Sequence, residues 1–421
     1  MHTANKEKVD ISKAHNRLNY LDALRAFALL LGIVFHASLS FLPIFIGWAV
    51  VDVSTSQAVA FFAFVSHSFR MELFFLIAGF FSHMTFHRSG IRAFVKTRIM
   101  RIAIPFFLAW IILRPLILSA WAMGSQSVSG NIHFMDSLLV GLQQFIQRPE
   151  EFLTNTHLWF LYYLILSTTI VLSVRFISRG HPYLYKQGIR WADLMVMQIA
   201  CSRFSWLALS LPTGLCLWFM KDPGVDTPDT SLVPHWPVLI IYCGFFIFGW
   251  LLDRQPKLIE VFSQLSIWRA ALCATAIISA IGFSDYFQIT EGEYNVWLRL
   301  GAVLTYAIMM WSLVSCSIGL FKHFFDQPNK LVRYLADASY WLYLIHLPIV
   351  VWLQVTVAKL PFHWSVKLAA ISLITIGFSI IIYDLCIRSS FIGKMLNGRK
   401  KDRMLFRTER LKQPTETNIK M

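Results

Sequence analysis

The stretch LNYLDALRAFALLLGIVFHASLSFLPIF, residues 18–45, decides the fold because it is an apolar run long enough to cross a bilayer. It also contains two ionisable residues, Arg25 and His36, which are eleven positions apart. At about 100° per residue this spacing returns to nearly the same helix face, about 16 Å further along the axis. Ionisable groups inside a lipid-spanning helix cost about a few kcal/mol each. The pair therefore predicts either a function or a buried partner.

The composition predicts an all-α integral membrane protein. Of 421 residues, 56% are hydrophobic and only 14% are charged, whereas soluble domains carry about 25% charged residues. Ten apolar runs are long enough to span a membrane: 21–46, 57–86, 94–120, 157–178, 196–220, 234–252, 267–284, 296–320, 331–357 and 364–388. The fifth run is the least regular, because Arg203 and Pro212 interrupt it.

The basic residues predict the orientation of these helices. Lys and Arg gather before the first run, in the even-numbered connections and after the last run. The positive-inside rule then predicts that both termini are cytoplasmic. We expect a basic tail at 1–17, a transmembrane domain at 18–388 and a second basic tail at 389–421. This topology accounts for most of the net charge of +15, so no nucleic-acid partner is needed, although the tail could meet anionic lipid.

Other site classes find little support in the sequence. The six cysteines fall in or beside apolar runs and form no CxxC pair, so neither structural disulfides nor a metal site is expected. The chain has no GxxxxGK[ST] or HExxH motif. The largest outer connection, 120–156, is long enough for a cap or a short amphipathic helix.

Counting along each run at about 1.5 Å per residue sorts the intramembrane polar residues into two layers. The layer in the outer half holds His36, His67, Arg70, Glu72 and His346. The layer near the cytoplasm holds Asp22 and Arg25, with Asp337 at a similar depth. Two polar layers joined by one face of the first helix predict a path through the membrane.

Simpler interpretations stay open for each of these residues. Asp22 and Arg25 are spaced i,i+3 and form a salt bridge at a helix start in one interpretation. A lone intramembrane histidine is often bonded only to helix backbone. Arg70 is harder to explain in this way, because Arg remains charged and an i,i+2 neighbour such as Glu72 does not face it.

At these residues the chain resembles the acyltransferase 3 family of integral membrane O-acyltransferases. Arg25 and His36 match that family's R-x10-H signature, and RIMR (98–101) is similar to its RxxR motif. FFLIAGFFS (74–82) resembles its FFxxSGFxx helix, with Ala78 where Ser is common. HLWFLYYL (157–164) and YLIHLP (343–348) match two later family motifs. These matches are in order and cover most of the transmembrane part.

The resemblance implies a donor and an acceptor. Family members use cytoplasmic acyl-CoA and modify a sugar hydroxyl, often on the far side of the membrane. The chain is most similar to members that transfer succinyl groups to osmoregulated periplasmic glucans. We therefore expect a bacterial inner-membrane protein with succinyl-CoA as donor, a periplasmic glucan as acceptor and no permanently bound cofactor.

The resemblance also implies roles for residues near the cytoplasmic face. Arg98 and Arg101, spaced i,i+3, are expected to bind the CoA phosphates, although ordinary positive-inside charge is the alternative. Arg25 would hold a phosphate or orient the pantetheine arm, with Asp22 beside it.

The expected catalytic residues are His36, Arg70 and Glu72. His36 would act as general base on the sugar hydroxyl, or form a transient acyl-imidazole. Arg70 would stabilise an oxyanion or pair with a succinyl carboxylate. Glu72 would orient a histidine or take a proton. His67, His157, Trp159 and His346 are expected to bind substrate, and a membrane-interface aromatic belt is the alternative for Trp159.

Three functions remain open at this point. The first is succinyl transfer to a periplasmic glucan. The second is acetyl transfer to another surface polysaccharide, such as a lipopolysaccharide or capsule sugar. The third is transport of glycans or small anions without catalysis; the chain shows no inverted repeat of the kind common in transporters.

Overall fold

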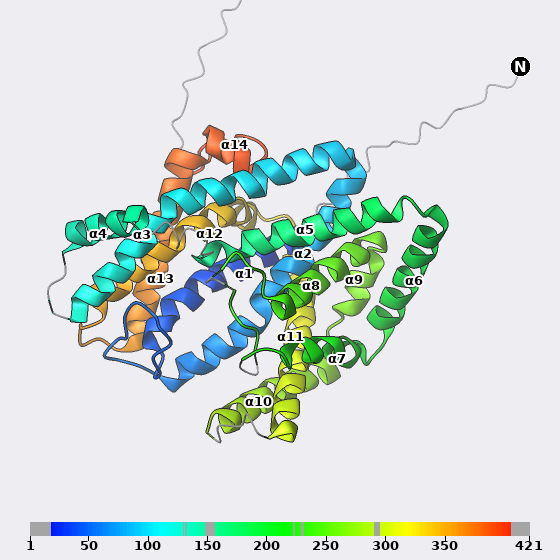
Figure 1. Cartoon of the computed structure of the whole chain (residues 1–421), viewed down its shortest axis with the longest axis horizontal. Helices are drawn as coiled ribbons and strands as arrows, with labels where there is room; N and C mark the ends of the chain where they lie inside the picture. The colour runs from blue at the N-terminus through cyan, green and yellow to red at the C-terminus, as the bar shows by residue number, and fades with distance from the viewer. Residues whose placement is uncertain are drawn as a thin grey trace, which may run out of the picture.

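The computed structural model describes residues 18–128, 130, 133–147, 156–221, 224–228, 231–289 and 295–405. These residues are mostly helical and contain no strand, in agreement with the predicted all-α membrane bundle (Figure 1). The predicted tail 1–17 and residues 406–421 of the second tail lie outside the described residues.

The helices follow one another along the chain. They are α1 (Asn19–Ser38), α2 (Gln57–Arg98), α3 (Ile104–Val128), α4 (Phe134–Gln147), α5 (Trp159–Ser178), α6 (Pro182–Cys201), α7 (Ser205–Leu217), α8 (Trp236–Arg254), α9 (Lys257–Phe262), α10 (Ile267–Ile289), α11 (Val296–Phe325), α12 (Lys330–Val357), α13 (Trp364–Ile382) and α14 (Phe391–Asn397). Two π-helical turns, Ile99–Ala103 and Tyr383–Ile387, follow α2 and α13.

Eight helical segments among the described residues are long and apolar enough to cross a membrane, or nine with one bent pair. One of them, Gln57–Val128, is 72 residues long and contains the predicted runs 57–86 and 94–120. Gly90 separates these runs with a φ of 74°, a conformation that glycine adopts readily. Figure 1 shows the chain turning back after this point, so the segment contains two limbs of the bundle.

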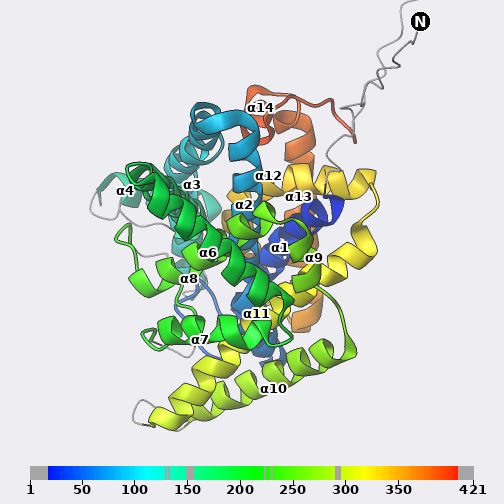
Figure 2. The same ribbon diagram turned by 90° about the vertical axis from the view of Figure 1, so that its right-hand side faces the viewer.

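The prediction of one helix over 196–220 is wrong. This region belongs to α6 and α7, which meet at an angle of 118° across a short break. Asp193 in α6 accepts from Arg254 at the end of α8 (2.6 Å), and this pair holds α6 across the bundle. Figure 2 shows α6 running obliquely over its neighbours, with α7 leaving it at a sharp angle.

Contacts place the two ends of the described chain on one face. Asn19, at the start of α1, donates to the carbonyl of Asp326 (3.1 Å), which follows α11. Lys401, after α14, pairs with Asp337 near the start of α12. We call this the inner face and its opposite the outer face, after the predicted topology. That the inner face meets the cytoplasm stays a prediction from the basic residues.

Glycines allow the closest helix contacts. A Cβ on Gly79 of α2 would overlap the carbonyl of Phe246, and one on Gly249 of α8 would overlap the carbonyl of Leu76. Small residues at such crossings let two membrane helices approach backbone to backbone. This crossing fixes α2, which carries Arg70, against the centre of the bundle.

The outer connection contains a short helix of the kind expected for 120–156. Helix α3 continues to Val128, and α4 then packs back on α3 through Gly141 and Ser137. Apolar side chains on the other faces of α4, such as Leu139 and Ile146, are exposed. The helix is therefore amphipathic and caps the outer end of α3.

Candidate active site

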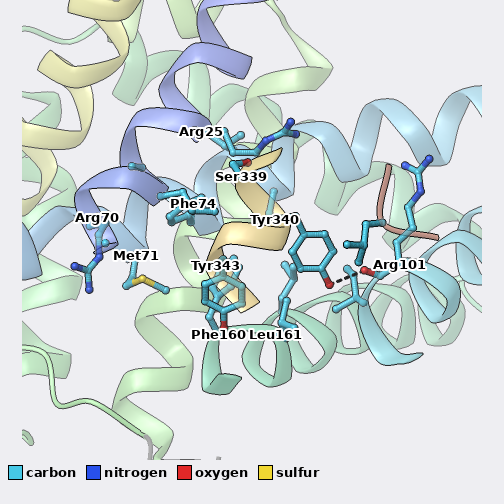
Figure 3. A pocket seen from close by; sticks show the side chains of 18 of the residues that line it. Arg25, Arg70, Met71, Phe74, Arg101, Phe160, Leu161, Ser339, Tyr340 and Tyr343 are labelled. Atoms are coloured by element: carbon cyan, nitrogen blue, oxygen red, sulfur yellow. Dashed lines mark hydrogen bonds between the residues drawn. The ribbon is translucent and has the colours of Figure 1, made fainter. Parts of the chain in front are cut away.

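One cavity of about 280 Å³ extends along the face of α1 that carries Arg25 and His36. Its walls come from α1, α2, the π-helical turn Ile99–Ala103, α5 and the turn before it, α12 and α14. The predicted residues that line it are Arg25, His36, Arg70, Arg98, Arg101, His157, Trp159 and His346. The cavity thus joins the two predicted polar layers, and Figure 3 shows many of its lining side chains.

Three arginines line the inner end of the cavity. Arg25 lies 3.4 Å from Asp22, donates to the carbonyl of Ala336 (3.1 Å), and has a side chain 36% exposed. Arg98 donates to Ser82 Oγ (2.6 Å). The positive charge of Arg101 lies close enough to those of Arg98 and Arg25 for mutual repulsion. Within the described ranges neither Arg98 nor Arg101 forms an ion pair. This end therefore carries positive charge that a polyanion would neutralise.

The middle of the cavity is apolar and aromatic. Phe74 and Met71 of α2 face Phe160 of α5 and Tyr343 of α12 across it (Figure 3). Tyr340 fixes the π-helical turn before α3, because its hydroxyl donates to the carbonyl of Arg101 (2.7 Å). Such a lining suits an extended, mostly uncharged chain between two polar ends.

Three histidine rings form the far end. The ring of His36 lies 5.1 Å from that of His346, which lies 5.5 Å from that of His157. His157 Nε2 bonds the carbonyl of Leu344 (3.0 Å) and His346 Nδ1 that of Tyr343 (2.7 Å). Because a carbonyl only accepts, these nitrogens carry the protons in the neutral rings.

His36 is held differently from the other two. No carbonyl or carboxylate of the described residues bonds either of its ring nitrogens, and Nδ1 is buried without a partner. Its ring is flanked instead by His346 and by Trp48, whose centroid is 6.0 Å away in an edge-on arrangement. An imidazole that is buried but not engaged can exchange a proton with a bound substrate.

Arg70 reaches the same end from α2. It is 5% exposed, its guanidinium lies 4.1 Å from the ring centre of Phe35, and Nη1 has no hydrogen-bond partner. Its side chain packs beside Gly32 of α1, where an added Cβ would lie 3.7 Å from Arg70 Cδ, in ordinary van der Waals contact. Arg70 and His36 are within electrostatic range of each other. A buried cation with an open donor is a costly arrangement that an anionic group would relieve.

Three predicted site residues do not line the cavity. Asp22 lies beside Arg25 but outside the wall. His67 stacks on Phe35 (5.7 Å) and bonds the carbonyl of Val225 (2.9 Å). Glu72 is on α2 but is fully buried on a face away from the cavity, where it interacts electrostatically with Tyr242 and Arg70. These residues support the wall from outside it.

The aromatic-belt interpretation of Trp159 is wrong. The indole is 6% exposed and stacks on Tyr242 (5.4 Å), so it lies inside the bundle and not at a lipid interface. Within the described ranges no cluster of three His, Cys, Asp or Glu side chains could hold a metal ion.

A family model described as an acyltransferase domain, Acyl_transf_3, matches residues 18–384. The chain belongs to the acyltransferase 3 family. It is 24% identical over 387 residues to the glucans biosynthesis protein C of Escherichia coli strains K12, O157:H7 and SMS-3-5, covering 90% of this chain and 94% of each relative. No solved structure matches the chain.

Beside His36, this membrane acyltransferase has bonded residues that the sequence did not single out. Trp48 Nε1 donates to Gln354 Oε1 (2.9 Å), and Gln354 Nε2 donates to the carbonyls of His36 and Ala37 (3.0 Å each). Trp48 also meets Trp121 edge-on at 5.2 Å. Among the described residues, none from 42–56 or α4 lines the cavity.

Two further lining residues, Leu396 and Asn397, belong to the predicted tail. Nothing in a basic terminal segment signals that it folds back on the bundle. Gln354 did offer a signal, because it is a lone amide inside the apolar run 331–357. A buried amide in a membrane helix needs hydrogen-bond partners.

Proposed function

We propose that this acyltransferase transfers a succinyl group from succinyl-CoA at the inner face to glucose hydroxyls of osmoregulated periplasmic glucans, in the bacterial inner membrane. The observation that carries this proposal is the single cavity with three arginines at one end and His36 and Arg70 at the other. The names of the relatives, glucans biosynthesis protein C, support a glucan as acceptor.

The donor is proposed to lie along this cavity. Its phosphates would meet Arg98 and Arg101 at the inner end, where guanidinium groups can bind phosphate oxygens in pairs. Arg25 would guide the pantetheine arm into the aromatic middle. The spacing of Arg25 and His36 along α1, about 16 Å, is on the order of an extended pantetheine arm. The thioester would then reach the histidine end.

The transfer step is proposed to use His36 as general base. The sugar hydroxyl gives its proton to His36 while its oxygen attacks the thioester carbonyl. The tetrahedral intermediate then expels the CoA sulfur, which takes the proton from His36, leaving a sugar ester and free CoA. Arg70 stabilises the oxyanion, or holds the free carboxylate of the succinyl group, for which its open Nη1 is suited.

The acceptor is proposed to approach from the outer face. Trp48 and Gln354 lie between His36 and that face, so the glucan must displace the Trp48 side chain. The bonded arrangement keeps outer water away from the thioester until an acceptor is present.

Mass spectrometry of periplasmic glucans tests the substrate pair. A deletion strain is expected to make glucans that lack the succinyl mass increment, and the intact chain restores it. Glucans with unchanged masses in the deletion strain would overturn the assignment. Loss of an acetyl increment, or a change in another surface polysaccharide, would assign the same chemistry to a different donor or acceptor.

A further inference from the structure

We propose that the C-terminal segment 391–401 completes the donor site, with Asn397 contacting the pantetheine amides and Arg399 and Lys400 contacting the phosphates. This inference rests on the proposed use of an acyl-CoA donor. It assigns a binding role to a segment that lies beyond the family match, which ends at residue 384.

The segment is folded back to the mouth of the cavity. Ser390 caps α14 by accepting from the backbone of Ile392 (3.2 Å), and Gly398 ends α14 with a φ of 81°. Past this turn, the backbone of Lys401 donates to the carbonyl of Arg388 (3.2 Å). The glycine conformation allows the chain to reverse here without strain.

Several bonds fix the reversed chain in place. Asp384 is fully buried and accepts from the backbone of Met404 (3.0 Å) and Leu405 (3.0 Å). Arg388 Nε donates to the carbonyl of Asp402 (2.7 Å). Lys401 pairs with Asp337; burial lowers the pKa of Lys401 and the bond to Asp337 opposes that shift. The segment is thus held at both ends of its turn.

The turn contacts the cavity directly. Leu396 and Asn397 line the wall, and a Cβ on Gly398 would overlap the guanidinium of Arg101. Asn397 Nδ2 donates to the hydroxyl of Tyr383 (3.0 Å), which orients the amide and leaves Oδ1 as an open acceptor. A pantetheine arm carries two amide N–H groups, so an oriented acceptor on the wall matches it chemically.

The charges point to the phosphate end of the donor. Arg399 and Lys400 are exposed, adjoin the turn at Gly398, and make no side-chain hydrogen bond to the described residues. They add two cations to the group formed by Arg25, Arg98 and Arg101. Two carboxylates near this group already have cationic partners, since Asp22 pairs with Arg25 and Asp337 with Lys401. Because Gly398 packs on Arg101, the two residues that follow it extend the positive charge beyond the cavity wall, which favours a ligand with several negative charges.

Steady-state kinetics and CoA binding with the full-length protein test this assignment. In Arg399→Ala/Lys400→Ala, we expect KM for succinyl-CoA and Kd for CoA to rise about five- to thirty-fold, because each exposed charge contact is modest. The turnover number should not change, since neither residue meets the reacting atoms. The increase should shrink at high salt. Asn397→Leu should raise KM without this salt dependence.

The matched control is Lys186→Ala/Arg190→Ala, which removes two exposed cations of α6 that do not line the cavity. Equal KM and Kd in wild type and Arg399→Ala/Lys400→Ala would overturn the proposal. The same holds if the variant loses only its binding to anionic lipid vesicles, because the two cations would then contact lipid and not the donor. Failure of the wild-type protein to bind CoA would instead refute the proposed donor, and this inference with it. Thermal unfolding of each variant identifies any loss that comes from misfolding.

Discussion

Arg70 occupies the most restrictive surroundings of any charged residue in the cavity. It lies over Phe35, beside Gly32, and keeps one guanidinium nitrogen without a partner. Neighbouring Glu72 does not neutralise it by contact, since the two form no ion pair. Its planar, always charged group can hold an oxyanion or a carboxylate with two hydrogen bonds, which a lysine cannot do in the same geometry.

Arg70→Lys is therefore expected to lower the turnover number by about 10²-fold or more, the usual cost of removing one oxyanion donor. Radiolabelled succinyl transfer to glucan measures this loss. Arg175→Lys is the matched control, because Arg175 also lies over a phenylalanine ring, Phe86 at 4.7 Å, but does not line the cavity. Full activity in Arg70→Lys would contradict bidentate recognition.

At the residue scale, the spacing of residues along a helix predicts much of the cavity wall. The remaining wall residues could not be predicted, for physical reasons. Arg25 and His36 share a face by spacing alone, and both line the cavity. Depth counting also places Glu72 at the level of His36 and Arg70, but depth does not say which way a side chain points. Glu72 is two positions from Arg70 on the same helix, so its side chain points to a different face of that helix. Asn397 could not be predicted, because its place depends on the turn at Gly398.

At the scale of helices, the crossing of α2 and α8 positions the end of the cavity that holds Arg70. Gly79 and Gly249 each lie against a backbone carbonyl of the other helix. Arg70 and Phe74 project from the same helix into the cavity. Any substitution that separates these helices would move that wall.

Gly79→Leu is expected to destabilise the fold by about 1–3 kcal/mol, the usual cost of overpacking, or to prevent assembly altogether. A fall in the thermal unfolding midpoint of the purified protein measures it. Gly244→Leu on α8 is the control, because a Cβ there meets nothing within 4 Å. An unchanged midpoint in Gly79→Leu would show that the helices do not pack this closely.

Apolar runs predict the existence of the spanning helices but not their bends. The run 196–220 is apolar throughout most of its length, yet the chain breaks between Cys201 and Ser205. The bond between Asp193 and Arg254 joins segments 61 residues apart, so no local pattern contains it. The break at Gly90 is similarly a backbone property that hydropathy does not report.

At the scale of the whole molecule, the helices enclose a cavity with distinct ends. The inner end is positive and partly exposed through Arg25, and Trp48 and Gln354 contact His36 at the outer end. Helix α1 spans both and supplies one polar residue to each. This asymmetry fits the proposed donor, which binds from one side of the membrane, and the proposed acceptor, which binds from the other.

The most direct test of this account is acyl transfer by the full-length His36→Ala variant, with CoA binding measured in the same preparation. General-base catalysis contributes about 10²–10⁴-fold, so transfer should fall by that factor while Kd for CoA stays within about threefold of wild type. His181→Ala, an exposed histidine before α6, should keep both properties. Acyl transfer at the wild-type rate by His36→Ala would contradict the assignment of His36 as general base.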